Sequence, residues 1–240
     1  MVCRLVALAW DAQDPLRLAR FWGSLLGWPV AEEDGGYLEV RPSDETGFVL
    51  RFFPTERAKT GKNRTHLDLT SDSLAGQQER VELALTLGAR HIDVGQRPEE
   101  PHVVLADPEG NEFCVIEPGN SFLAGCGVIG ALAGDGSQEV GHFWRDALGW
   151  PLVWDQDEET AIRAPDGGPK FSWGGPPVAP KTGKNRLRFT IAPMHSEDQQ
   201  AEVERLVALG ATRIDIGQGD VPRVVMADPD GNEFCVLRPR

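Results

Sequence analysis

The sequence predicts an α+β protein made of two tandem copies of one plan, residues 1–120 and 121–240. Long segments recur about 122 positions apart: FWGSLLGWPV at 21–30 returns as FWRDALGWPL at 143–152 (143 − 21 = 122). LGARHIDVGQ and VVLADPEGNEFCVIEP also return as near copies. Two copies of this length are typical of a duplicated domain and are too few for a solenoid.

Each half is predicted to contain two βαβββ units, and the first unit shows its signals in order. RLVALAW at 4–10 alternates between faces and predicts a strand. Asp14 is a helix cap with Pro15 at the first helical position, and Gly27 ends that helix. YLEV and FVLRFF then follow as short strands.

The second unit opens with HLDLT at 66–70, which predicts a strand. Ser71–Ser73 introduce a helix that runs to Leu87, and ARHIDV, HVVLAD and EFCVIE complete the unit as strands. The second half repeats this order, with Ser196 and Gln199 at capping-box spacing before its last helix. Because each helix links strands that can lie side by side, we expect mixed sheets.

Composition and charge exclude several classes of protein. The 240 residues are 40% apolar and carry a formal charge of −13, which argues against a nucleic-acid partner and against an anionic membrane. No apolar run approaches the ~20 residues of a membrane helix. The first residues read as a strand and not as a signal peptide. The four cysteines form no CxxC pair, so we expect free thiols in the cytoplasm.

A repeated hexapeptide precedes the most informative difference between the halves. KTGKNR at 59–64 returns unchanged at 181–186, but the next strand then changes: His66 is replaced by Arg188. The hexapeptide lacks phosphate-loop spacing and precedes a strand, so we interpret it as a scaffold connector. The scaffold was kept, and the residues that follow it were altered.

The paired units, the FWxxLLGW helix and the final DPxGNEFCV strand resemble the vicinal oxygen chelate superfamily. That superfamily includes glyoxalase I, extradiol dioxygenases, fosfomycin-modifying enzymes and bleomycin-binding resistance proteins. The resemblance covers nearly the whole chain, twice. It implies two glyoxalase-like domains, each made of two βαβββ units that form a curved mixed sheet, or cup. The fold implies no single activity, and the sequence leaves open whether cups form within or between the halves.

In the metal-using relatives the ligands come from the first strand, from the strand that opens the second unit and from the last strand, and the metal acts as a Lewis acid. The resemblance places these positions on Ala7, His66 and Cys114, and in the second half on Ile129, Arg188 and Cys235. An arginine cannot lose its proton to bind a cation, so no metal is expected in the second half. A divalent metal fits the first half only if a substitute ligand joins His66, and the first choice is Glu112, which shares a strand face with Cys114. The leading expectation is that the chain binds no cofactor.

The remaining candidates are assigned by residue type. His66 is the first choice as a catalytic group. Cys114 could act as a nucleophile only with His66 as its base, and its alternative role is that of a buried residue that packs in the core. His102 is matched by Arg223 in the second half, and three tryptophans without a counterpart are candidates for an aromatic wall. The predicted ligand-binding set is His66, Asp68, Glu112, Cys114, Trp10, His102, Arg188, Arg223, Glu233, Cys235, Trp154 and Trp173.

The function that these residues favour is the binding of a small organic molecule without the metal triad of the family, in drug sequestration or secondary metabolism. The alternative is a glyoxalase-like lyase or isomerase that acts in the first half, with a rebuilt metal or acid–base site around His66. A third interpretation makes the second half structural, completing a pseudo-dimer. A monomeric pseudo-dimer or a homodimer is expected, with neither nucleic acid nor membrane as partner.

Overall fold

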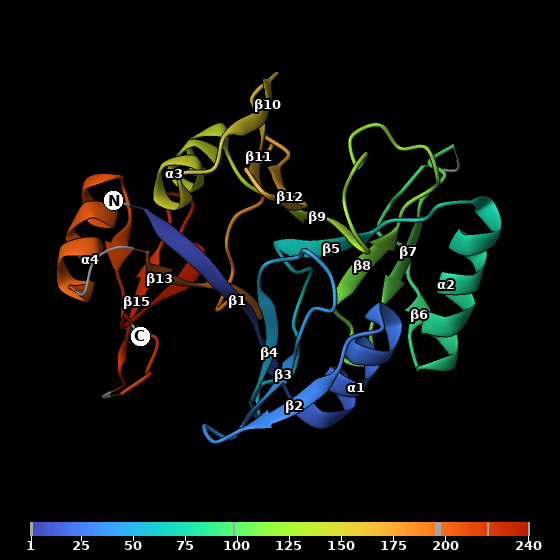
Figure 1. The fold of residues 1–240 in the computed structure, drawn as a ribbon, viewed down its shortest axis with the longest axis horizontal. Coiled ribbons are helices and arrows are strands. Elements are labelled where there is room, and N and C mark those ends of the chain that lie inside the picture. Colours follow the sequence, from blue (N-terminus) through green and yellow to red (C-terminus); the bar gives the residue numbers. More distant parts are fainter. Residues whose placement is uncertain (1, 98, 195–197, 220, 240) are drawn as a thin grey trace.

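The computed structural model describes residues 2–97, 99–194, 198–219 and 221–239. Within these ranges the chain forms two eight-stranded mixed sheets and four helices (Figure 1). The α+β class and the repeated βαβββ units are confirmed. Among the described helices, none has the length and apolar content that crossing a membrane requires.

The first half supplies two units, each with one helix. The first unit consists of β1 (Cys3–Ala12), α1 (Pro15–Leu26), β2 (Val30–Glu33), β3 (Tyr37–Val40) and β4 (Val49–Pro54). The second unit consists of β5 (Thr65–Leu69), α2 (Leu74–Thr86), β6 (Arg90–His91), β7 (Val103–Ala106) and β8 (Glu112–Val115).

The second half repeats this order. Its first unit consists of β9 (Ile129–Gly134), α3 (Gln138–Leu148), β10 (Leu152–Gln156), β11 (Glu159–Ala164) and β12 (Gly167–Trp173). Its second unit consists of β13 (Leu187–Pro193), α4 (Gln199–Ala208), β14 (Thr212–Arg213), β15 (Arg223–Ala227) and β16 (Glu233–Leu237).

Each sheet is assembled from one unit of each half. Sheet A has the strand order β14-β15-β16-β13-β1-β4-β3-β2, and sheet B has the order β10-β11-β12-β9-β5-β8-β7-β6. β1 pairs antiparallel with β13, and β5 pairs antiparallel with β9, so the middle of each sheet joins the two halves. The sequence left open whether the curved sheets form within or between the halves, and the strand order places both sheets between the halves. The reason is the free edge of β1 beyond β4, and of β9 beyond β12, which needs a strand partner.

The helix ends follow the signals in the sequence. Asp14 caps α1 by accepting the backbone N–H of the third helical residue at 3.0 Å, and Gly27 ends the helix with a left-handed φ of 72°. Ser73 caps α2, as expected. The cap of α4 is Asp198, whereas the expected cap, Ser196, lies outside the described residues.

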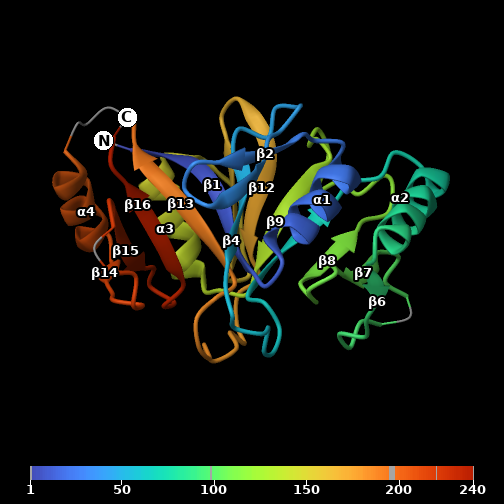
Figure 2. The same cartoon turned by 90° about the horizontal axis from the view of Figure 1, so that it is seen from below.

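One continuous apolar core lies between the sheets and contains α1 and α3 (Figure 2). The ring centroid of Trp22, on α1, lies 6.1 Å from that of Trp10 in sheet A and 5.2 Å from that of Phe113 in sheet B. Trp144, on α3, lies 5.1 Å from Phe234 of sheet A. Each sheet therefore packs one face against the helices, and its opposite face, which we call the open face, carries the alternate side chains.

Two of the predicted ligand-wall tryptophans belong to this core. Trp10 is 2% exposed and Trp173 is 5% exposed. Each shares a strand face with a buried neighbour two residues away, Leu8 and Phe171, so strand alternation directs both indoles inward. Trp154, on the edge strand β10, is 41% exposed and stays available to a ligand.

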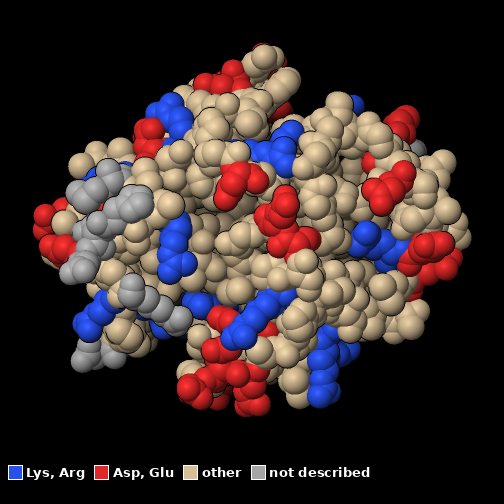
Figure 3. All heavy atoms as spheres, viewed as in Figure 1, with Lys and Arg blue, Asp and Glu red and all other residues tan. Residues whose placement is uncertain are grey.

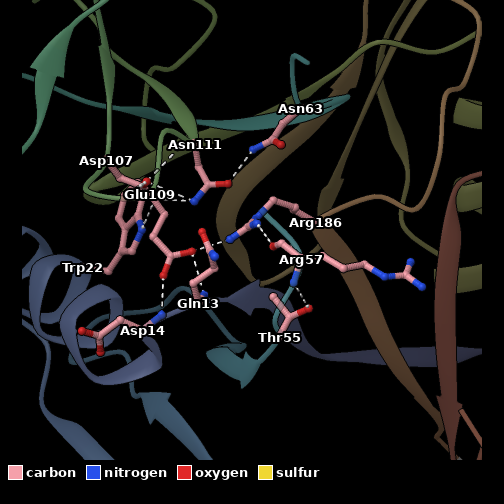
Figure 4. A network of polar contacts seen from close by, with 10 residues as sticks. All are labelled: Gln13, Asp14, Trp22, Thr55, Arg57, Asn63, Asp107, Glu109, Asn111 and Arg186. Carbon is pink, nitrogen blue, oxygen red and sulfur yellow. Dashed lines mark hydrogen bonds and ion pairs between the residues drawn. The ribbon is translucent and has the colours of Figure 1, made fainter. Parts of the chain in front are cut away.

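The repeated DPxGNE turn is anchored by a buried carboxylate (Figure 4). Asp107 accepts the indole N–H of Trp22 at 3.2 Å and the backbone N–H groups of Glu109 and Asn111, each at 2.9 Å. Asp228 repeats these contacts in the second half. Burial raises the pKa of Asp107 to about 6 against these hydrogen bonds, and the turn thereby holds the start of β8.

The repeated connector is a scaffold, which explains why its sequence recurs. Lys59 Nζ lies 2.8 Å from Glu112 Oε1, and Asn63 N donates to Glu112 Oε2 at 3.2 Å. Lys181 makes the same contact with Glu233 at 2.7 Å. Both glutamates, predicted as ligand-binding groups, thus hold the connectors to the last strand of each half.

Candidate functional site

The open face of sheet B brings His66, Asp68 and Cys114 together. His66 and Asp68 share one face of β5, and Cys114 lies on β8 directly opposite Asp68. One ligand atom from each of the three residues lies within 4.8 Å of the other two. On the other side of β5, His66 faces Ala133 and Asp68 faces Ala131 of β9, so small residues flank the cluster. The cluster itself therefore lies within the first half, and the pairing between the halves adds its flank of small residues.

His66 is a partly exposed acid–base group. Its side chain is 33% exposed, and its Nε2 lies 3.3 Å from Asp68 Oδ1. Burial opposes the charge on the imidazole, but the hydrogen-bonding and charge of Asp68, together with the charge of Glu112, outweigh it. The pKa of His66 is raised above its ordinary value as a result. The imidazolium is therefore retained to a higher pH than in a free histidine.

Cys114 has the properties of a buried thiol. It is 8% exposed and belongs to a small apolar cluster with Val104, Ile116, Leu123 and Ala131. Burial, followed by the charge of Asp68, raises the pKa of the Cys114 thiol strongly. A thiolate nucleophile needs the opposite shift, so this environment argues against nucleophilic catalysis by Cys114.

A cavity of about 620 Å³ lies over the part of sheet B that the second half supplies. Its lining combines an ammonium group, a hydroxyl and two aromatic rings around a small floor residue, namely Lys170, Ser172, Phe122, Trp154 and Ala133. Ala133, which is part of the lining, is the cross-strand neighbour of His66, so the cavity begins one strand away from that histidine. Aromatic walls with a few polar groups are typical of small-molecule sites.

The segment that joins the two halves, residues 117–128, contributes one wall of the cavity. Lys170 Nζ donates to the carbonyl oxygen of Phe122 and lies 4.6 Å from the centre of its ring. Arg163 donates to the carbonyl oxygen of Gly125. These two contacts fix the joining segment beside the open face, so that Phe122 faces the cavity.

The open face of sheet A differs at the matching positions. Arg188 replaces His66 (188 − 66 = 122), and the cross-strand neighbour is an alanine in both sheets, Ala9 for Arg188 and Ala133 for His66. Arg188 Nη2 lies 2.6 Å from Asp11 Oδ1, and Lys184 Nζ lies 2.7 Å from Asp11 Oδ2. Burial opposes the charge on Asp11, but the two cations outweigh it and lower the pKa of its carboxyl. The Arg188 side chain is 8% exposed and is held by an internal ion pair.

The other predicted site residues are spread over the molecule. His102 Nε2 lies 3.9 Å from Glu100 Oε2, just before β7, and Arg223 is the first residue of β15. Both are partly exposed at strand ends. Cys235 is buried on sheet A, opposite Thr190 of β13. The structure thus gathers His66, Asp68 and Cys114, places Trp154 and Trp173 in the lining of the nearby cavity, and separates the rest.

Most of the cavity lining was not predicted from the sequence, including Phe122, Lys170 and Ser172. The segment KFSW, which ends β12, alternates polar and buried aromatic residues, and this pattern does place Lys170 and Ser172 on one face. What the pattern lacks is the pairing of β5 with β9, which brings that face to His66.

The chemistry of the His66 cluster fits a divalent metal ion. Imidazole, carboxylate and thiolate are all ligands that zinc accepts. Asp68 Oδ1 is buried without a well-aligned hydrogen-bond donor, and a cation would satisfy this oxygen. Glu112, the expected substitute ligand, is instead held by Lys59. The pKa values of His66 and Cys114 are both raised, so protons compete with any metal for this site.

Comparison with known proteins extends these observations. A family model described as a glyoxalase-like domain matches residues 7–116 and again residues 131–237. Glyoxalase 1 of Caenorhabditis elegans is 22% identical over 205 residues, which cover 81% of this chain and 67% of that protein. Glyoxalase I from Zea mays has a TM-score of 0.65 at 14% identity, covering 98% of this chain and 92% of that chain. A putative dioxygenase from Bacillus subtilis has a TM-score of 0.63 at 14% identity, covering 99% and 86%.

Proposed function

The chain belongs to the glyoxalase-like domain family, within the vicinal oxygen chelate superfamily, and from that premise we propose that it binds a small organic molecule on the open face of sheet B. The observation that carries this proposal is the contrast between the two open faces. His66 is 33% exposed beside a cavity of about 620 Å³, whereas Arg188, at the matching position, is 8% exposed and paired with Asp11.

The cavity lining indicates the class of ligand. Phe122 and Trp154 offer faces for a flat apolar group, and Lys170 and Ser172 offer donors to oxygen atoms. The Lys170 ammonium has three protons, and its contact with the Phe122 carbonyl uses one of them. A flat molecule with one or more anionic or carbonyl oxygens fits this arrangement. Such molecules occur among drugs that a protein could sequester and among secondary metabolites.

The second candidate function is a lyase or isomerase reaction at the same site, and the contact between His66 and Asp68 favours it. A histidine oriented by a carboxylate is a common general acid or base. Its raised pKa sets the direction of the pH dependence: a His66 base is active only above that pKa, and a His66 acid only below it.

Replacing His66 by alanine distinguishes the two functions. For a binding protein, we expect affinity for a captured ligand to fall by about 1–3 kcal/mol, the cost of one buried polar contact. For an enzyme, turnover is lost altogether. His102→Ala is the matched control, because His102 lies near Glu100 at a strand end. Calorimetry on both variants measures the effect, and unchanged affinity in His66→Ala would remove His66 from the site.

Ligand binding is expected to be independent of metal, while added zinc competes with protons at His66, Asp68 and Cys114. A bound ion would supply Lewis-acid chemistry there. After treatment with a chelator, zinc affinity should rise with pH, because zinc must displace the proton of His66 and the proton of Cys114. Cys114→Ser should abolish uptake, and Cys235→Ser, at the matching position of sheet A, should not. Loss of ligand binding on chelation would contradict metal independence.

A further inference from the structure

A second cavity, of about 550 Å³, lies between the two connectors and apart from the cavity of sheet B. The connectors run side by side where the two halves meet, as the cyan and orange loops in Figure 2 show. The charged residues that line this second cavity are Arg57, Lys62, Arg64, Lys184, Arg186, Asp11 and Asp135. We call this space the central cavity.

The central cavity is positively charged in a strongly acidic chain. Its lining holds five cationic and two anionic side chains, a balance of +3 (5 − 2), whereas the whole chain carries −13. On the face of the molecule drawn in Figure 3, acidic and basic side chains are interspersed. A cavity whose walls carry mostly one sign of charge concentrates ions of the opposite sign.

Two of these cations are held in place by backbone carbonyl groups. Arg64 donates to Ala179 O at 2.6 Å and to Asp135 O at 3.1 Å. Arg186 donates to Arg57 O at 2.9 Å and pairs with Glu109 (Figure 4). Each arginine thus bonds to the residues just before the connector of the other half. The guanidinium of Arg64 keeps its full charge because both of its acceptors are carbonyl oxygens.

Unused donors also lie in this wall. The Nε atoms of Arg64 and Arg186 are buried and have no hydrogen-bond partner in the described structure, and Arg186 is 9% exposed. Leaving a buried charged donor unpaired costs free energy, so a ligand acceptor would be stabilising if the guanidinium groups turned these closed-off atoms toward it. Arg57 and Lys62 are exposed and extend the cationic lining toward solvent.

The two carboxylates do not cancel this charge. Asp11 lies between Lys184 and Arg188, two cations for one anion. Asp135 accepts the backbone N–H of Ala179 at 3.1 Å, and it is the carboxylate that a bound anion must avoid. The balance stays at +3 when Arg188 and Glu109 are both included, since they add one charge of each sign.

We propose that the central cavity binds a small multivalent oxyanion of the phosphate-ester or pyrophosphate class. Arginine and lysine donors that converge from both halves match the several oxygens of such an anion. This site is separate from the open face of sheet B, so the chain has room for two ligands of different chemistry.

The test is calorimetric titration of the full chain with inorganic pyrophosphate, in a buffer free of phosphate. Saturable binding that weakens as salt is added is expected. The double variant Arg57→Gln/Lys62→Gln should bind at least about tenfold more weakly, since it removes two exposed cations from the lining and, besides them, only the exposed hydrogen bond from Lys62 to the carbonyl oxygen of Val94. Arg4→Gln/Arg20→Gln removes the same charge from exposed positions elsewhere and should bind like the native chain.

Three outcomes would overturn the proposal. They are the absence of saturable binding, equal weakening in both double variants, and loss of pyrophosphate binding in Ala133→Phe. The last variant fills the cavity of sheet B, where Ala133 is part of the lining, and leaves the connectors intact. It therefore separates failure at the central cavity from failure of the proposed function.

Discussion

Replacing Arg188 by methionine is expected to lower the free energy of unfolding by about 3 kcal/mol, the lower end of the cost of breaking a buried ion pair. The substitution leaves the Asp11 carboxylate, whose side chain is 13% exposed, with Lys184 as its remaining cation. Methionine fills a similar volume, so the loss reports on charge and not on an empty space. This pair occupies the open face of sheet A, whereas His66, at the matching position of sheet B, is partly exposed.

A double-mutant cycle with Asp11→Ala measures the interaction itself. Because removing both charges leaves neither one buried alone, Asp11→Ala/Arg188→Met should be more stable than Arg188→Met. The sign of the pH effect follows from the lowered pKa of Asp11: its stabilisation is present above the ordinary carboxyl pKa of about 3.9 and is lost as pH falls through the lower, folded value. Urea unfolding at several pH values tests this. If the free energy of unfolding that Arg188→Met loses did not become smaller in acid, the result would contradict the ion pair.

Asp107→Ala is expected to cost about 3–5 kcal/mol, because it leaves several buried donors without an acceptor. The donors are the indole N–H of Trp22 and the backbone N–H groups of Glu109 and Asn111 (Figure 4). Each unsatisfied donor costs roughly 1–3 kcal/mol. Partial relaxation of the turn keeps the total below the sum.

Asp228→Ala is the matched variant, since Asp228 holds the same turn in the second half and should lose a similar amount. Burial raises the pKa of both carboxyls to about 6, so the stabilisation from this shift is present below about pH 4 and is lost as pH rises through about 6. Thermal unfolding of both variants near each pH checks the size and the direction. If both variants lost less than about 1 kcal/mol of unfolding free energy, these residues would not anchor the turns.

Local features of the fold could be predicted from the sequence because their causes are local. Asp14, Gly27 and Ser73 cap or end helices through bonds to residues within a turn of them. The repeated hexapeptide was correctly interpreted as scaffold, and Lys59 shows the reason, since it binds the last strand of its own half. The position of His66 on an open sheet face also followed from alternation and resemblance.

The rest of the site depends on pairing between the halves, which alternation along one strand does not contain. Lys170 borders the same face as His66 only because β9 pairs with β5. Asp11 was not expected to pair with Arg188, since 177 residues separate them. Trp10 was expected at a ligand wall and lies in the core, because a tryptophan without a counterpart in the other half still follows the alternation of its strand.

The most direct test of ligand binding on sheet B is a ligand-observed NMR screen of flat, oxygen-bearing aromatic fragments against the native chain and Ala133→Phe. The substitution places a ring on the cavity floor beside His66 and removes no polar group. We predict that fragments bind the native chain and lose binding to Ala133→Phe, while its melting temperature stays close to that of the native chain. Fragments that bind both proteins equally would place the ligand site elsewhere and contradict the proposed function.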